Sequence, residues 1–154
     1  MRFVLAPVLS SIALGGCLYM PSSYSFESHP FVGKRVALTC LDVAVAMTDD
    51  NRATSPVVRY SFGNRCTHET TVDLGAVPAY GLATNGEHVA MHAYDPRHEL
   101  RPLPIDGWWR GSESIMYTTV NGEPPPLAVC VDVGAIEGPA TQTHREVCVG
   151  AVEL

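Results

Sequence analysis

Alternation of apolar and polar residues with a period of two is the feature that most constrains this chain. Every clearly patterned segment of the 154 residues shows it, as expected for β-strands with one buried face. No segment repeats apolar side chains at positions i, i+3, i+4 and i+7, the spacing of an amphipathic helix. Turn-forming pairs, among them Gly63-Asn64, Asn85-Gly86 and Asp106-Gly107, separate the segments. The pattern predicts short antiparallel strands.

The strands are expected at residues 35–48, 57–66, 70–74, 79–84, 87–94, 100–105, 112–120, 127–133 and 145–151. In the first of these, the alternation changes phase at Cys40 and Leu41, as a β-bulge would cause. Asn85-Gly86 suits a type I′ hairpin turn. About seven to nine strands and no helix predict an all-β fold, an antiparallel immunoglobulin-like β-sandwich that disulfides stabilise. A small β-barrel is the alternative.

The first 16 residues have the pattern of a secretory signal, with Arg2 followed by an apolar run and then small residues. The tetrapeptide Leu14-Gly15-Gly16-Cys17 resembles the lipobox of bacterial lipoproteins. This resemblance implies cleavage before Cys17, addition of diacylglycerol to its sulfur, and acylation of its new amino group. Two or more fatty chains would hold the protein on a bilayer.

The residue after this cysteine is Leu18 and not Asp, which by the same resemblance implies the outer membrane of a diderm cell. An uncleaved membrane helix over residues 3–20 and a cleaved, soluble secreted protein are the alternatives. Residues 17–33 carry two Pro and four Ser beyond the cysteine, which is typical of a flexible tether. The β-sandwich domain is therefore expected at residues 34–154.

The other four cysteines would meet an oxidising compartment after export, where disulfides persist. They are Cys40, Cys66, Cys130 and Cys148. Folding residues 127–133 on 145–151 as a hairpin sets Cys130 opposite Cys148 and aligns the valines of both segments. Folding about position 53 sets Cys40 against Cys66, although the phase change shifts that register by one. Zinc is the rival interpretation, but no C-x-x-C pair exists.

No catalytic set, phosphate loop or cofactor motif can be assembled from the sequence. His88 and His92, with His98 further on, would be a metal pair on a helix; on a strand the first two stand about 13 Å apart. Asp132 opposite Glu146 is expected to mark a solvated face. These histidines or these two acids would be the centre of the alternative function, a small metal-dependent or carboxylate-based envelope enzyme.

Trp108, Trp109 and Arg110 form the candidate binding site, because paired tryptophans beside arginine in a loop are typical of recognition sites. The alternative is that one tryptophan plugs the end of the core and the other shields a strand edge. The net charge of −6 argues against nucleic acid. We expect a non-catalytic binding or scaffolding module, bound to the membrane through Cys17, whose partner is another envelope protein or a glycan. It could serve as an anchoring subunit of a larger envelope assembly.

Overall fold

The computed structural model describes residues 31–48, 55–94, 100–120, 124, 126–138 and 143–150. Cys17, His98 and the whole signal segment 1–16 lie outside these residues. Within them the chain forms strands and two 3₁₀ turns, with no α-helix. The strands are β1 (Lys34–Ala37), β2 (Leu41–Met47), β3 (Val57–Asn64), β4 (Thr70–Val72), β5 (Ala79–Leu82), β6 (His88–Tyr94), β7 (Leu103–Ile105), β8 (Arg110–Thr119), β9 (Ala128–Asp132) and β10 (Glu146–Gly150).

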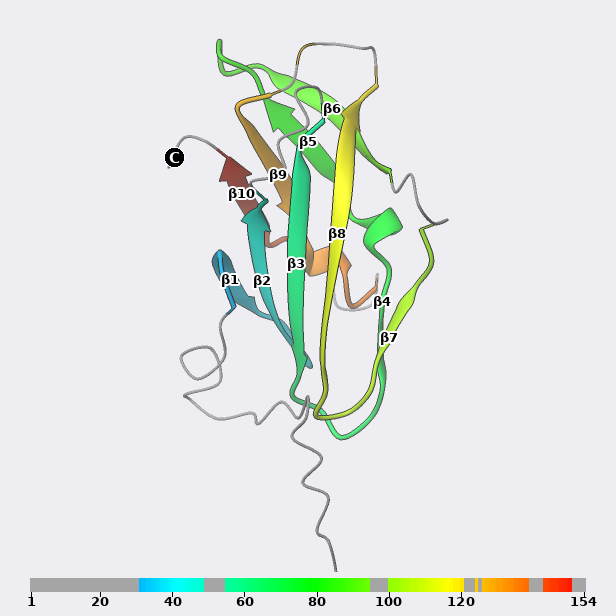
Figure 1. The fold of residues 1–154 in the computed structure, drawn as a ribbon. Coiled ribbons are helices and arrows are strands. Elements are labelled where there is room, and N and C mark those ends of the chain that lie inside the picture. The colour runs from blue at the N-terminus through cyan, green and yellow to red at the C-terminus, as the bar shows by residue number, and fades with distance from the viewer. Residues whose placement is uncertain are drawn as a thin grey trace, which may run out of the picture.

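Eight of these strands form one antiparallel sheet in the order β1-β2-β3-β8-β6-β5-β9-β10. Figure 1 shows β1, β2, β3 and β8 in front, with β6, β5, β9 and β10 behind them. The two layers are hydrogen-bonded to each other where β8 pairs with β6, whereas the sheets of an immunoglobulin domain are separate. β10 comes back against β2, so that the curled sheet is nearly closed like a barrel. The predicted all-β, antiparallel, disulfide-stabilised fold is confirmed.

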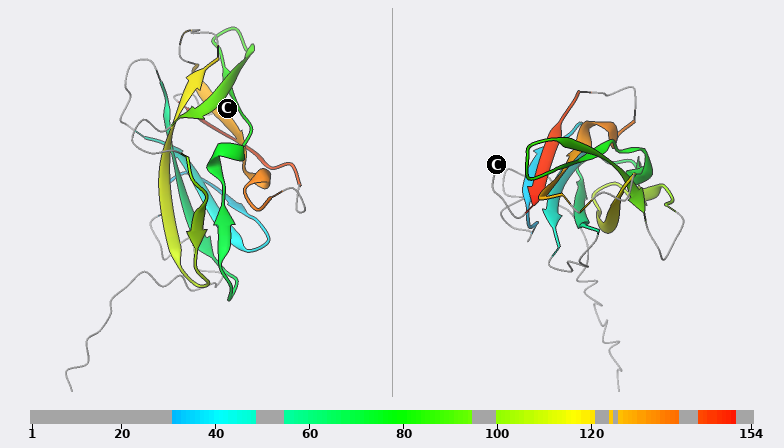
Figure 2. Two further views of the ribbon diagram at one scale, coloured as in Figure 1. Left: turned by 90° about the vertical axis from the view of Figure 1, so that its right-hand side faces the viewer. Right: turned by 90° about the horizontal axis from the view of Figure 1, so that it is seen from above.

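The core fills the space between the layers. The period-two pattern explains which side chains enter it, because Leu41, Val43 and Val45 of β2 point inward together and are fully buried. Tyr60 and Phe62 of β3 follow the same rule, and their rings stack with centroids 6.3 Å apart. The remaining small sheet, β4 paired with β7, lies beside β8 (Figures 1 and 2).

The chain reverses direction at the place where the sequence pattern changes phase. The Leu38 N–H donates to the Leu41 carbonyl across 2.7 Å, and β1 and β2 then run antiparallel with Val36 opposite Val43. The prediction of one bulged strand over residues 35–48 is therefore wrong. A tight turn places two residues outside the ladder, and this shifts the alternation just as a bulge would.

The hairpin of β9 and β10 has the predicted register. Cys148 lies opposite Cys130, with Val131 on Val147 and Val129 on Val149. A disulfide joins the two cysteines, whose Cα atoms are 3.9 Å apart. This bridge lies within the rear layer of the sheet.

The second predicted disulfide, Cys40–Cys66, is also present, with its Cα atoms 5.2 Å apart. The ladder of β2 and β3 pairs Leu41 with Asn64, so the register is one residue away from a direct Cys40–Cys66 pairing. The bridge therefore runs diagonally, just beyond the ends of both strands. It lies within the front layer.

Two turn predictions are corrected. Asn85-Gly86 does join β5 to β6, but only Gly86 has a positive φ, +81°. The Gly86 N–H donates to the Ala83 carbonyl and the Ala83 N–H donates to the Glu87 carbonyl. This is a three-residue loop ending in a left-handed glycine and not a type I′ turn. Gly63-Asn64 is no turn, because both residues belong to β3.

The packed part of the chain begins before the predicted boundary at Lys34. Phe31 is buried against Ala44, which points to the outer face of β2. Gly33 between them has φ +114°, and a β-carbon there would stand 2.1 Å from the Val45 carbonyl oxygen. Glycine thus lets this segment lie flat on the sheet.

Candidate functional site

Three connections meet at the lower end of the molecule in Figure 1. They are the β1–β2 turn at residues 38–40, the β3–β4 loop at residues 65–69, and the β7–β8 loop at residues 106–109. The Cys40–Cys66 disulfide joins the first to the second. The Trp108 N–H, donating to the Cys66 carbonyl across 3.2 Å, joins the second to the third. We call these three connections the tryptophan end.

Asn64 fastens the tryptophan end from inside. Its side chain is fully buried, and its amide group donates to the carbonyls of His68 (2.8 Å) and Ile105 (2.9 Å). Its Oδ1 accepts from the Cys66 N–H at 2.9 Å, and its own backbone N–H donates to the Trp109 carbonyl at 2.9 Å. One buried amide therefore fixes two loops against each other, because each of these groups would otherwise be unsatisfied.

Both tryptophans lie on the surface of this end. Trp108 is 38% exposed and Trp109 is 46% exposed, so the alternative in which one plugs the core is wrong. Trp108 has φ +65°, a left-handed conformation rare for a bulky residue. Gly107 leaves no room for a side chain, since a β-carbon would lie 2.4 Å from the Thr67 carbonyl. Arg110, half-buried, begins β8 opposite Gly63.

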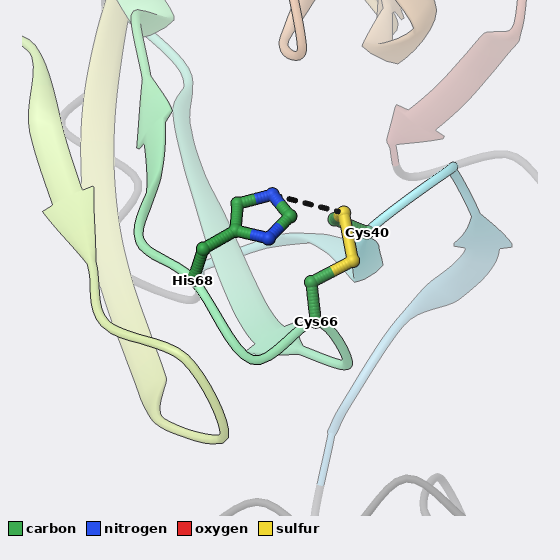
Figure 3. Close-up of side chains that lie close together, drawn as sticks. All are labelled: Cys40, Cys66 and His68. Atoms are coloured by element: carbon green, nitrogen blue, oxygen red, sulfur yellow. Dashed lines mark hydrogen bonds between the residues drawn. A yellow bond between two sulfur atoms is a disulfide. The ribbon is translucent and has the colours of Figure 1, made fainter.

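His68 lies beside the disulfide at the tryptophan end (Figure 3). Its Nε2 is 3.8 Å from the Cys40 sulfur, and it is itself exposed, while Cys40 and Cys66 are half-buried. The ligand atoms of these three residues fall within 4.8 Å of one another. Because the two sulfurs are bonded to each other, they offer no thiolate to a metal in this form. Sequence spacing does not point to this histidine, since only the path of the β3–β4 loop brings it to the sulfur.

Charged side chains hold the β1–β2 turn in place. Glu137 accepts three backbone N–H groups, those of Thr39 (2.8 Å), Cys40 (2.7 Å) and Leu41 (2.8 Å). Arg65 donates to the carbonyls of Leu38 and Thr39. Its Nε also lies 3.2 Å from the buried Asp42 carboxylate, a contact that is an ion pair without hydrogen-bond geometry.

A pocket of about 260 Å³ opens beside Glu137. It lies between the β1–β2 turn and the start of β10, and its walls are mainly polar. They are formed by Ala37, Leu38, Thr39, Gly134, Glu137, Thr143 and Arg145. Both carboxylate oxygens of Glu137 are already engaged by the turn, so this acid serves the fold first.

His88 and His92 lie on the same exposed face of β6. The ring of His88 stacks on Tyr80 with centroids 4.3 Å apart, and His92 Nε2 is 2.9 Å from the Thr118 hydroxyl. The third histidine of that prediction, His98, lies outside the described residues. Among the residues that are described, neither His88 nor His92 joins a cluster with metal-ligand spacing.

Asp132 and Glu146 face each other across β9 and β10 as predicted, but they have separate partners. The Asp132 carboxylate accepts the N–H groups of Gly134 (3.1 Å) and Arg145 (2.8 Å), and its other oxygen is 2.8 Å from His144 Nδ1. Burial alone would raise the pKa of Asp132, but these hydrogen bonds outweigh it and the pKa is lowered. The carboxylate of Asp132 thus caps the turn after β9. Glu146 has a different partner, Tyr80, whose pKa is raised by burial and then by the hydrogen bond to Glu146.

No family model and no curated protein sequence matches the chain. A crystal structure of the yjhA protein from Bacillus subtilis is similar, with a TM-score of 0.49 and 7% sequence identity. The similarity covers 77% of this chain and 96% of that one.

None of the described segments forms a helix of the length and hydrophobicity that crossing a membrane requires.

Proposed function

We propose that this chain is a lipid-anchored bacterial envelope protein that acts as a non-catalytic binding or scaffolding module through Trp108, Trp109 and Arg110. The observation that carries the proposal is the exposure of both tryptophans on a loop that is held rigidly. Large aromatic side chains are costly to leave in water, and exposed pairs of them mark interaction sites. The anchor part of the proposal rests on the resemblance of Leu14-Gly15-Gly16-Cys17 to a lipobox.

The fixed backbone of the tryptophan loop supports a role for this loop in binding a partner. Asn64, Gly107 and the Cys66 carbonyl fix the backbone on both sides of the tryptophans. A surface ordered in advance loses little conformational entropy when a partner docks, and this raises affinity. The left-handed Trp108 fits the same interpretation, because strained conformations persist where surrounding contacts impose them and cluster at functional sites.

The chemistry of the loop suits a flat, weakly polar partner. Indole rings stack on sugar faces or on apolar peptide side chains while the N–H still reaches an acceptor. Arg110 adds a planar donor at the start of β8 for a carboxylate or carbonyl. The partner proposed is therefore a glycan or another envelope protein, and the second case would make the chain an anchoring subunit of a larger assembly.

Membrane fractionation tests the anchor. The full chain, produced in a bacterium with its own leader, is expected to pellet with membranes and to carry fatty acyl groups on Cys17. The Cys17→Ala variant should leave the membrane fraction. If that variant pellets as the wild type does, the lipid anchor is refuted.

Partner binding tests the loop. A Trp108→Ala, Trp109→Ala double variant is compared with Tyr94→Ala, which removes another exposed aromatic residue, 48% exposed on β6. Each protein is used to capture envelope proteins and is also titrated with soluble cell-wall glycan fragments. Binding should be lost only in the double variant. Since the chain contains two tryptophans, both in this loop, intrinsic tryptophan fluorescence reports the same event directly. An equal loss in both variants would contradict the proposed role of the loop.

A further inference from the structure

The two disulfides differ in the side chain that lies next to a sulfur atom. His68 Nε2 is 3.8 Å from the sulfur of Cys40, so a histidine that can carry positive charge faces the first bridge. Glu146 Oε1 is 3.9 Å from the sulfur of Cys148, so a carboxylate faces the second. Both sulfur-bearing residues of the first bridge are half-buried, whereas Cys130 of the second is fully buried.

We propose that the Cys40–Cys66 disulfide is a site of thiol–disulfide exchange, at which an external thiol attacks Cys66 and Cys40 leaves with help from His68. The thiolate of the external molecule forms a new S–S bond with the Cys66 sulfur. The Cys40–Cys66 bond breaks, its electron pair passes to the Cys40 sulfur, and the protonated His68 Nε2 supplies the proton. The external thiol is thereby oxidised to a mixed disulfide and Cys40 is reduced to a thiol.

A second thiol completes the reaction. Its thiolate attacks the external sulfur of the mixed disulfide, and the bond to Cys66 breaks to release a Cys66 thiolate, which takes a proton from water. The two external thiols leave joined to each other as a disulfide. They have been oxidised by two electrons, and the protein disulfide has been reduced to two thiols. The substrate class is a small thiol such as glutathione, or an exposed protein thiol able to reach a half-buried sulfur.

Cys40 is the sulfur that leaves because the departing thiolate is better stabilised there. Thiolates depart faster when their pKa is low, and a neighbouring imidazolium lowers it. Other charges also lie near Cys40: the Glu137 carboxylate accepts three backbone N–H groups, one of them from Cys40 itself, and Arg65 is paired with Asp42. Of these groups, His68 is the one whose side chain approaches the sulfur itself.

The Cys130–Cys148 disulfide should resist the same reagent for two reasons. An incoming thiolate that reaches the half-buried Cys148 meets the negative charge of Glu146. The leaving thiolate would then be Cys130, which is fully buried in β9, and burial disfavours a charged sulfur. The second bridge is therefore a matched internal control within the same molecule.

Mass spectrometry tests the order of reaction and its direction. The folded, oxidised protein is treated with reduced glutathione without oxygen, quenched with excess N-ethylmaleimide at successive times, and mapped by peptide. The first products should carry glutathione on Cys66 and N-ethylmaleimide on Cys40, with Cys130–Cys148 intact. Glutathione on Cys40, or equally fast opening of both bridges, would overturn the proposal.

The role of His68 needs its own variant. His68→Ala keeps the backbone carbonyl that Asn64 binds, and His144→Ala removes another exposed histidine, whose Nδ1 contacts the Asp132 carboxylate. Opening of Cys40–Cys66 should slow about tenfold in His68→Ala at pH 6 and stay unchanged in His144→Ala. The ratio of wild-type to His68→Ala rates should shrink toward one as the pH is raised from 6 to 8, since only the charged ring can donate the proton. A ratio that is constant with pH would refute proton donation by His68. Should His68→Ala misfold, the peptide map of the wild type still decides the proposal.

This proposal is independent of what the tryptophan loop binds. Exchange is read from the mass of cysteine peptides, and partner binding is read with Trp108→Ala, Trp109→Ala. A protein that binds nothing through its tryptophans would still show selective opening at Cys66, and a protein with two inert disulfides could still bind through the loop.

Discussion

The phenolic oxygens of Tyr60 and Tyr117 lie 2.5 Å apart in the middle of the core. The two residues come from the neighbouring strands β3 and β8, and both side chains are fully buried. Each hydroxyl is the other's hydrogen-bond partner, which satisfies two polar groups that water cannot reach. Burial, and then the neighbouring Tyr117, raise the pKa of Tyr60 well above its usual value. Burial also raises the pKa of Tyr117 to about 12, against the lowering effect of the same hydrogen bond.

This tyrosine pair predicts loss of stability in alkali. Tyrosines of the unfolded chain lose their protons near pH 10, while in the folded protein the pair stays neutral up to about pH 12. The folded state therefore binds more protons in this range, so the free energy of unfolding falls as the pH rises from about 10 towards 12. Urea titrations followed by circular dichroism at pH 8 to 11.5 measure it. The Tyr60→Phe, Tyr117→Phe double variant should show a shallower loss; an identical slope would contradict the assignment.

Single replacement of either tyrosine should cost more than replacing both. Tyr117→Phe leaves the Tyr60 hydroxyl buried without its partner, which costs about 1–3 kcal/mol of unfolding free energy. The double phenylalanine variant removes both polar groups and should lie closer to the wild type. Urea midpoints at pH 7 for the two single variants and the double variant form a thermodynamic cycle, in which additive effects would rule out coupling.

Asn64→Ala should destabilise the protein and loosen the tryptophan end together. The substitution removes the acceptor of the Cys66 N–H and the donors to Ile105 and His68. We expect about 2–4 kcal/mol lower unfolding free energy, from several buried groups left without partners. Tryptophan fluorescence should shift to the red and become more accessible to acrylamide. Asn85→Ala, in an exposed turn, is the control, and it should leave the fluorescence unchanged.

Two substitutions at Trp108 separate the cost of its left-handed backbone from the binding role of its ring. At φ +65° a glycine is free of the steric cost that any side chain bears, so Trp108→Gly should be more stable than Trp108→Ala by about 1 kcal/mol. Both variants lack the indole ring and should lose partner binding alike. Thermal unfolding measures the difference. Equal stability of the two variants would mean that the left-handed conformation is relaxed by other means.

Acid should weaken the turn after β9. The pKa of Asp132 is lowered in the folded protein, so its contribution to stability is present above its unfolded value of about 3.9 and is lost as the pH falls through the folded pKa. Asp132→Asn should therefore flatten the acid limb of the stability profile below about pH 4. Asp73→Asn, in which the replaced carboxylate accepts the single N–H of Gly75, should change it less.

The sequence alone could predict the hairpin of β9 and β10 because two independent signals agree there. The valines of both segments match only in the register that also opposes Cys130 and Cys148, and a slip by one residue would turn every valine outward. At Cys40 a single signal was available. A change of phase is compatible with a bulge or with a reversal of the chain, and only the pairing of β1 on β2 decides between them.

The candidate binding residues of the tryptophan end could be predicted from the sequence, but the contacts that hold them in place could not. Trp108, Trp109 and Arg110 stand out by residue type, yet their exposure depends on Asn64, which the sequence suggested as part of a turn. Glu137 also escaped notice, because its partners at the β1–β2 turn are 96 to 98 residues away. Such contacts leave no mark on local periodicity, since either partner alone is an ordinary polar residue on a surface segment.

Each disulfide closes a loop inside one layer of the sheet, over 26 residues at Cys40–Cys66 and 18 residues at Cys130–Cys148. The oxidised chain therefore never becomes a free coil. Each closed loop lowers the conformational entropy of the unfolded chain, which adds roughly 3 kcal/mol to the free energy of unfolding. Neither bridge crosses from one layer to the other, so the layers are held together by core packing, by the pairing of β6 with β8, by the contact of β10 with β2 and by the hydrogen bonds of Glu137 to the β1–β2 turn. Each layer of the oxidised protein therefore contains one cross-linked hairpin, β2–β3 in front and β9–β10 behind. Mutations along the β6–β8 seam should consequently change the folding rate, while reduction of the bridges acts chiefly on the unfolded state.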